Sequence, residues 1–369
     1  MINQAGSSKL KEVFLDKNDQ KEVNLENLEL SVTKIEDFEE EGIIGGRQTH
    51  ITLKGPKSFM IGTDQAGFKL SNENKLIDSG KLPISDNTLR DIVYIPSINS
   101  YLLATNFSIY KKEIDKSPIK LFLDIKCGHI DRPGSFLRYS RFNQRLIVSQ
   151  ESRSISVINP KTKKIELEFK AILRDYDHIQ DLRIFGVHED RVAVLTVFGN
   201  LILFRLNSKV LRGLETRYEI ELVNDTTKDE EPVSVTVCDK NRYIGVEIGI
   251  YDSPYICSRM LVFRIEDDHH LALKTSLDLF GEDIGCKYAF DCFGYLGSRF
   301  VIWVGLTTEL DIIAQVYVYD IKRGVLEELV DKRVPHVEVD PYRFHRIENE
   351  LYYTGNLAQL MRLGFKVNE

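Results

Sequence analysis

The stretch from Gly128 to Phe169 reads GHIDRPGSFLRYSRFNQRLIVSQESRSISVINPKTKKIELEF, and it decides the fold. Four short apolar runs lie in it, separated by polar turns of a few residues: Phe136–Tyr139, Leu146–Ser149, Ile155–Ile158 and Ile165–Phe169. Short apolar runs at this spacing are typical of antiparallel strands joined by tight turns. The stretch therefore predicts a four-stranded antiparallel unit.

Similar units recur along most of the chain, and the second strand of each unit is the clearest marker. We place the second strands at Ser58–Gly62, Tyr101–Thr105, Leu146–Ser149, Val192–Val197, Tyr243–Ile248, Phe300–Val304 and Leu351–Thr354. A repeat of about 40–50 residues with four strands in each repeat is typical of a β-propeller. No long stretch shows the periodicity of an amphipathic helix.

The last unit lacks a fourth strand, and the run Val23–Ile35 ahead of the first unit can supply one. A ring has to close or leave two sheet edges exposed, and exposed edges invite aggregation. We therefore predict an all-β fold, a seven-bladed β-propeller of four-stranded antiparallel blades whose last blade is closed by an N-terminal strand. Residues 1–22 are expected to be a flexible tail, and residues 23–369 a single domain.

Two insertions lengthen one of the units. The polar segment Asn224–Glu231 precedes its first strand, and Ile250–Ser258 lies between its second and third strands. The second exceeds what a hairpin connection needs, and we expect it to be a loop. Loops of this kind are more often functional than the strands that they connect.

Composition and charge narrow the class of protein. The net charge of −7 provides no overall basic field to attract nucleic acid or an anionic membrane. No apolar run is long enough to span a membrane, and the first residues lack the apolar segment of a signal peptide. The five cysteines are scattered, which favours reduced thiols. We expect an intracellular protein, cytoplasmic or nuclear.

Two dipeptides point to a known class of propeller. Gly128–His129 stands before a predicted first strand, and Tyr319–Asp320 ends a predicted third strand. They resemble the Gly-His and Trp-Asp pairs of the WD40 repeat, so the chain resembles the WD40 class of β-propeller over roughly Gly45–Phe365. The hydrogen-bond network of His, Ser, Asp and Trp that is typical of the family cannot be assembled in any unit. The resemblance is to a degenerate WD40-like propeller and identifies no subfamily.

No stretch carries a catalytic signature. The sequence lacks a G-x-S-x-G motif and a phosphate-binding loop. The neighbouring His269 and His270 would face opposite ways and could not share one metal ion. We therefore expect no enzymatic activity, no cofactor and no metal. The alternative is a propeller hydrolase with an axial metal ion, for which Asp64 and Asp311 are acidic candidates.

A candidate binding face follows from the predicted connections. Arg47, Arg90 and Arg132 fall in the loops before first strands, on the same side as Tyr251 and Tyr255 of the second insertion. Arg and Tyr are enriched at binding hot spots, so these residues predict a partner-binding face suited to acidic segments. The alternative is that the arginines are scattered surface residues.

The leading functional hypothesis is a non-catalytic protein–protein interaction scaffold. Such a protein would dock partner proteins or peptides on one propeller face and belong to a multiprotein complex, with no membrane partner. Fold analogy is the basis of this hypothesis. Nucleic-acid binding through the arginine-bearing face is a further alternative, which the acidic net charge disfavours.

Overall fold

The computed structural model describes most of the strands and fewer of the connections between them. The described ranges are 28–37, 48–55, 57–63, 67–73, 75–82, 89–105, 108–115, 117–124, 136–150, 154–169, 177–186, 188–206, 214–222, 228–238, 242–252, 255–266, 270–279, 287–293, 299–307, 312–320, 325–328, 334–335, 345–347, 350–354 and 359–367. Side chains are described for part of these ranges, all of it between residues 52 and 277. Within the described ranges every regular element is a β-strand except one 3-10 helix, which confirms the all-β prediction.

The strands pair antiparallel into a series of sheets, and the strands follow the order of the sequence in every sheet except the one that contains β1. The first sheets comprise β2 (Gln48–Gly55), β3 (Ser58–Thr63), β4 (Gly67–Asn72) and β5 (Lys75–Lys81); β6 (Leu89–Ile95), β7 (Ser100–Thr105), β8 (Ser108–Glu113) and β9 (Lys120–Asp124); and β10 (Leu137–Ser140), β11 (Arg145–Gln150), β12 (Ser154–Ile158) and β13 (Ile165–Phe169). The 3-10 helix η4 (Pro96–Ile98) joins β6 to β7.

The later sheets continue the series. They comprise β14 (Ile179–Phe185), β15 (Arg191–Thr196), β16 (Asn200–Arg205) and β17 (Leu214–Glu219); β18 (Lys228–Cys238), β19 (Tyr243–Asp252), β20 (Tyr255–Ile265) and β21 (Leu271–Leu279); and β22 (Lys287–Phe293), β23 (Arg299–Thr307), β24 (Ile312–Asp320) and β25 (Val325–Glu328), with β26 (Val334–Pro335) also beside β24. A further sheet combines β27 (His345–Ile347), β28 (Glu350–Thr354) and β29 (Gln359–Val367) with β1 (Leu28–Asp37), which pairs antiparallel with β29.

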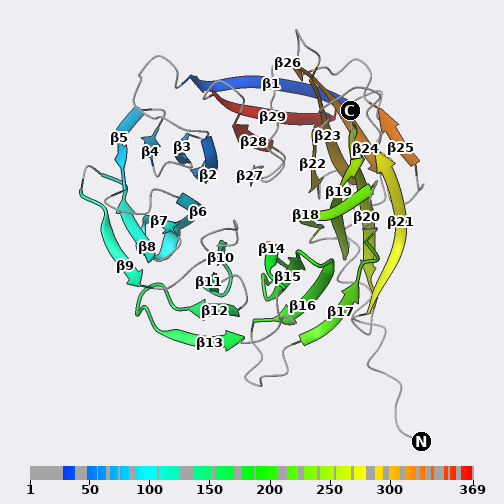
Figure 1. Cartoon of the computed structure of the whole chain (residues 1–369). Helices are drawn as coiled ribbons and strands as arrows, with labels where there is room; N and C mark the ends of the chain where they lie inside the picture. Colours follow the sequence, from blue (N-terminus) through cyan, green and yellow to red (C-terminus); the bar gives the residue numbers. More distant parts are fainter. Residues whose placement is uncertain are drawn as a thin grey trace, which may run out of the picture.

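The sheets stand around a common centre, with the first strand of each sheet nearest to it (Figure 1). The fourth strands, such as β9 and β13, lie at the perimeter. This arrangement places the first strands of neighbouring sheets side by side, so side chains from one sheet can reach the backbone of the next.

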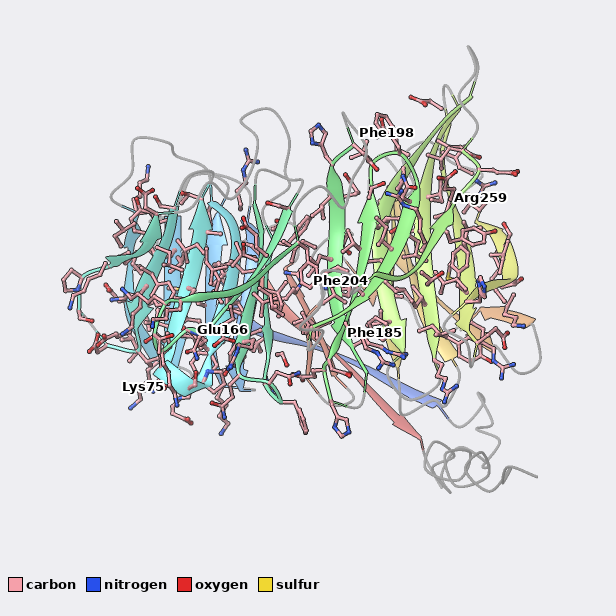
Figure 2. All side chains as sticks on the ribbon, turned by 90° about the horizontal axis from the view of Figure 1, so that it is seen from below. Lys75, Glu166, Phe185, Phe198, Phe204 and Arg259 are labelled. Atoms are coloured by element: carbon pink, nitrogen blue, oxygen red, sulfur yellow. The ribbon has the colours of Figure 1, made fainter. Side chains whose placement is uncertain are left out.

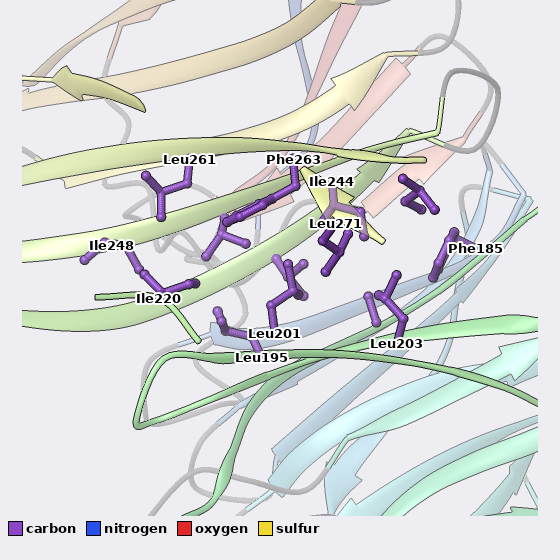
Figure 3. Close-up of a cluster of buried hydrophobic side chains, with 14 residues drawn as sticks. Phe185, Leu195, Leu201, Leu203, Ile220, Ile244, Ile248, Leu261, Phe263 and Leu271 are labelled. Carbon is purple, nitrogen blue, oxygen red and sulfur yellow. The ribbon is translucent and has the colours of Figure 1, made fainter. Parts of the chain in front are cut away.

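The hydrophobic core lies between consecutive sheets. Apolar side chains of the β14–β17 and β18–β21 sheets pack against each other, among them Leu195, Leu203, Ile244 and Phe263 (Figure 3). Similar clusters fill the spaces between the preceding pairs of sheets, back to the β2–β5 sheet. A sheet that is covered on both faces needs apolar residues at successive positions, which explains why second strands are continuous apolar runs. The strand β7, for example, is buried at every position.

The predicted strands are confirmed in place. Each predicted second strand is a strand of the structure, with ends that differ by a few residues at most. The predicted strand Val23–Ile35 corresponds to β1, which covers Leu28–Asp37. Residues 1–22, which we expected to be a flexible tail, lie outside the described residues.

The second of the two insertions was expected to be a loop, and the structure corrects this expectation. The end of the first one, from Lys228, already belongs to β18. The second continues β19 and β20, with Tyr251 opposite Ile256 and Asp252 opposite Tyr255. Continued pairing satisfies backbone N–H and C=O groups that a loop would leave to water. The insertions therefore lengthen one sheet, which projects beyond its neighbours on the side of Phe198 (Figure 2).

Candidate functional site

The connections between strands lie on two faces. The loop face carries the segments that lead into each first strand and the turns between second and third strands. The turn face carries the turns between first and second strands and between third and fourth strands. Figure 2 shows Phe198, between β15 and β16, on the loop face, and Lys75, at the start of β5, on the opposite turn face.

The structure describes only part of the predicted binding face. Arg47 and Arg132 lie outside the described residues. Arg90 lies in β6 rather than in the loop before it, at a register shift between Leu89 and Asp91, because pairing with β7 begins earlier than the sequence indicated. Tyr251 and Tyr255 are strand residues of the lengthened sheet, described by their backbone alone. Whether these five residues lie together is therefore not tested, and their role in binding stays a prediction.

A buried ion pair anchors the base of the lengthened sheet. The Glu230 side chain is fully buried, and its Oε2 lies 2.7 Å from Nη2 of Arg259. The same Nη2 also donates to the backbone oxygen of Glu221 at 3.3 Å. A buried carboxylate that is paired and hydrogen-bonded is costly to disrupt. This pair holds β18 against β20.

One buried carboxylate organises a turn of the loop face. Asp177 Oδ1 accepts the N–H groups of His178 at 2.9 Å and of Phe198 at 3.3 Å, and Oδ2 accepts Asn200 Nδ2 at 3.0 Å. Gly199 has a φ of 77°, which the turn needs and which a glycine adopts without strain. The Phe198 side chain remains 56% exposed. The turn thus holds an aromatic ring outward on the loop face.

Asp91 links two neighbouring sheets near the centre. Its Oδ1 accepts the N–H of Ile92 at 2.8 Å, while Oδ2 accepts the N–H of Leu137 at 2.9 Å and lies 2.6 Å from Nη1 of Arg138. Burial raises the pKa of Asp91 above its ordinary value, although the Arg138 guanidinium and the two N–H groups act in the opposite direction. A carboxylate of the β6–β9 sheet therefore binds the first strand of the β10–β13 sheet.

Asp181 repeats this arrangement between β14 and β18. Its Oδ1 accepts the N–H of Leu182 at 2.7 Å, and its Oδ2 accepts the N–H of Val235 at 3.0 Å. Arg138 reaches it from β10, because its Nη2 lies 3.5 Å from Asp181 Oδ1 and its Nε donates to Leu182 O at 2.9 Å. Like Asp91, Asp181 follows a register shift, and such bulges redirect side chains. One arginine and two aspartates thus join three consecutive sheets.

Two turns on the turn face interlock across neighbouring sheets. Glu189, in the turn after β14, accepts the backbone N–H groups of Arg141 and, at 3.1 Å, of Phe142, in the turn after β10. Asn143 Nδ2 donates to the backbone oxygen of His188 at 2.9 Å and to that of Glu189 at 3.1 Å. The rings of Phe142 and His188 have centroids 4.5 Å apart, and Phe142 is 62% exposed. This aromatic pair is held rigidly and faces the solvent.

Sequence reasoning missed these functional candidates because their partners are distant in the chain. The residues of the aromatic pair lie in separate repeats, and neither stands in a recognisable motif. The signal for the sheet-linking aspartates is an Asp near the start of a first strand in both LRDIV and IQDLR. A comparison of first strands alone would have found it.

The described residues set further bounds on the chemistry. Among them, no group of three or more His, Cys, Asp or Glu side chains is arranged to hold a metal ion. Both Asp64 and Asp311 lie outside the described part of the chain. No helix in the described ranges is long and apolar enough to cross a membrane.

Comparison with known proteins identifies the fold. No family model matches the chain, and no curated protein sequence matches it either. Among solved structures, it resembles the β-propeller domain of Cps50 (Swd1) from Myceliophteria thermophila, with a TM-score of 0.56 and 8% sequence identity. The match covers 92% of this chain and 100% of the other. The chain therefore has a β-propeller fold like that WD40 propeller.

Proposed function

We propose that this β-propeller is a non-catalytic scaffold that docks partner proteins or peptides as a member of a multiprotein complex. The fold supports the proposal only by analogy, because propellers also host enzymes. Stronger support comes from the way in which the described polar side chains are used. At the centre they join one sheet to the next, and on the faces they fix turns.

The frame of the proposed scaffold is a closed ring of seven blades. Each blade would be one of the sheets described above, and β1 would complete the blade of β27, β28 and β29. In a closed ring every sheet has a neighbouring sheet on both sides. Such an arrangement favours a rigid body. A rigid body binds partners at a smaller entropic cost than a mobile one.

The observation that carries the proposal is the pair of interlocked turns. Phe142 is an exposed aromatic residue, yet hydrogen bonds from the neighbouring sheet fix the backbone on which it stands. Exposed aromatic residues in fixed positions are typical anchors of protein–protein interfaces. A surface turn without a binding role would not need the stabilising contacts that His188 and Asn143 make.

The other hypotheses gain no specific support from the described residues. The hydrolase hypothesis rests on Asp64 and Asp311, which lie outside the described residues. Asp91 and Asp181 are acidic side chains near the centre that the structure does describe. Their oxygens are engaged by backbone N–H groups and by Arg138. The arginine-bearing face for nucleic acid rests on Arg47, Arg90 and Arg132, of which only Arg90 lies among the described residues.

The test is affinity capture of the tagged full chain from its native cell, followed by mass spectrometry. We compare the natural chain with Phe142→Ala on the turn face and Phe198→Ala on the loop face, after circular dichroism has verified their folding. A scaffold should retain at least one protein in near-stoichiometric amount, and one variant should lose it. Retention of no protein, together with stoichiometric metal in the purified chain, would contradict the proposal.

A further inference from the structure

Four cations form a basic strip beside the aromatic pair. The strip comprises Arg141, next to Phe142, and Lys161, Lys163 and Lys164 in the turn between β12 and β13. All four side chains are exposed, and none forms an ion pair with another described residue. The whole chain carries a net charge of −7, so this local excess of positive charge opposes the overall balance.

Two carboxylates in or beside these turns are already engaged. Glu166 pairs with Arg145 and accepts Asn159 Nδ2 at 3.2 Å. Glu189 accepts backbone N–H groups of the turn after β10. Because these two acidic groups have partners, they leave the four cations of the strip available to an external anion.

Arg145 fixes the strip relative to the aromatic pair. Its Nη1 donates to the backbone oxygen of Asn143 at 3.1 Å, while its Nε pairs with Glu166 at the start of β13. The turn that carries the aromatic pair is thereby tied to the turn that carries the lysines. Lys163 is also held, because its Nζ lies 4.9 Å from the centroid of the Phe122 ring. The turn of Phe142 and the turn of the lysines are therefore held at the same end of one sheet.

We propose that the aromatic pair and the basic strip together bind an extended acidic segment of a partner protein that carries a bulky apolar side chain. The apolar side chain would pack on Phe142 and His188, and the flanking carboxylates would face the lysines and Arg141. This inference rests on the scaffold function proposed above and adds the chemistry of the partner. It also places the interface on the turn face, opposite the face that the sequence suggested.

A protein segment fits this surface better than a nucleic acid does. Four cations at the turns of a single sheet match a short cluster of carboxylates. A nucleic acid presents a long row of phosphates, and binding it takes many such contacts. Beyond the strip the net acidic chain would repel such a polyanion within a Debye length of about 8 Å.

The experiment measures fluorescence anisotropy of labelled probes with the purified full chain. The probes are a short Asp- and Glu-rich peptide with one central Phe, the same peptide with Ser in place of Phe, and a single-stranded oligouridylate of equal length. The variants are Phe142→Ala and Lys161→Glu/Lys164→Glu. The matched controls are Phe198→Ala, an equally exposed aromatic on the loop face, and Lys57→Glu/Lys75→Glu, an equal charge change in another sheet.

The proposal expects the Phe-containing peptide to bind with an affinity that falls as salt is raised. Phe142→Ala and the Lys161→Glu/Lys164→Glu variant should each weaken it about tenfold or more, while both controls bind as the natural chain does. Equal binding by all variants, or no binding of the peptide, overturns the proposal. Tighter binding of the oligouridylate, lost in the same variants, would make the strip a nucleic-acid site instead. If a cellular partner is lost only with Phe198→Ala, the scaffold function is supported, but the proposed binding site at the aromatic pair and the basic strip is wrong.

Discussion

The narrow gap between neighbouring sheets limits the size of the side chain that a position beside it can hold. Gly62 in β3 is buried where β3 approaches β6. A Cβ atom at this position would lie 2.1 Å from Leu89 Cδ2 and 2.7 Å from Ile92 Cδ1. Both neighbours are themselves buried, so neither can move into solvent. The glycine is therefore required by close packing rather than by backbone conformation.

Replacing Gly62 by Ala should lower the free energy of unfolding by roughly 1–3 kcal/mol, the usual cost of overpacking a core. The measurement is urea unfolding followed by circular dichroism. Gly80→Ala is the matched control, because a Cβ at Gly80 would meet only Phe68, at an ordinary contact distance of 3.5 Å. Equal stability of the two variants would show that the sheets are not packed as closely as described.

The buried Asp91 predicts a pH dependence of stability. Because its native pKa is raised from the ordinary value of 3.8, the native state holds this proton more tightly than the unfolded state does. The contribution of Asp91 to stability is therefore complete below about pH 3.8 and declines as the pH rises through the native pKa. The stability advantage of the natural chain over Asp91→Asn should shrink as the pH rises from about 4.

Asp115 supplies a control, because its pKa is shifted in the direction opposite to that of Asp91. The hydroxyl and the N–H of Ser117 hold the pKa of Asp115 below its ordinary value. Its contribution to stability is therefore present above that value and is lost as the pH falls. Melting temperatures of the natural chain, Asp91→Asn and Asp115→Asn across the acid range give both differences. Identical trends for the two variants would contradict the environment described for Asp91.

Strands of the same sheet differ in burial according to their place in the ring. The second strand β7 is buried along its length, whereas Leu121 in the outer strand β9 is 55% exposed. A register shift between Ile109 and Tyr110 accompanies this exposure, and third and fourth strands show the same irregularity in four other sheets. Exposed aliphatic residues occupy the matching positions, namely Leu76, Leu121, Ile165 and Leu273. The outer strands thus share a bulge that directs one aliphatic side chain to the perimeter.

The difference in burial between inner and outer strands predicts a large effect of Leu→Ala on stability in an inner strand and a small one in an outer strand. Leu102→Ala in β7 should cost about 2–5 kcal/mol of unfolding free energy, as core truncations do. Leu121→Ala in the same sheet should change it by no more than about 0.5 kcal/mol, as exposed substitutions do. Chemical denaturation of both variants measures the difference. A comparable loss for Leu121→Ala would mean that the perimeter is covered by something else, such as a second copy of the chain.

The sequence predicted strands better than it predicted the candidate site, for a physical reason. Strand positions depend on the local pattern of apolar residues. A strand that is buried on both faces has a continuous apolar run, such as Tyr101–Thr105. Contacts such as Glu189 to Phe142 join residues that lie in different repeats, so no local pattern marks them. The prediction for Ile250–Ser258 was wrong for a different reason. The length of the segment suggested a loop, but its β-forming residues allowed the pairing of β19 with β20 to continue.

At the scale of the whole molecule, the sheets from β2–β5 to β18–β21 share their apolar cores with their neighbours. The apolar clusters lie between sheets, and Asp91, Arg138 and Asp181 bind the first strands of one sheet to the next. A sheet that was removed would expose apolar surface on both of its neighbours. These sheets are therefore expected to unfold as one cooperative unit. In the proposed closed ring, we expect the weakest point to be the place where the two ends of the chain meet.

That meeting point is the antiparallel pairing of β1 with β29, which runs from Leu28 opposite Val367 to Asp37 opposite Gln359. Deleting residues 1–37 would remove the outer strand and expose the full length of β29, an edge that invites aggregation. We expect a large fall in melting temperature or loss of the soluble protein. Deleting residues 1–22 leaves β1 in place and should change the melting temperature little, which makes it the matched control.

Complementation separates a missing strand from a general loss of folding. A synthetic peptide of residues 28–37 can pair with β29 in the manner of an added strand, because main-chain hydrogen bonds supply most of the affinity in such complexes. Added to the chain that lacks residues 1–37, it should restore the melting temperature toward that of the natural chain, whereas a peptide of the same composition in scrambled order should not. If both truncated chains melt like the natural one, β1 does not close the ring, and the last blade is stable with three strands.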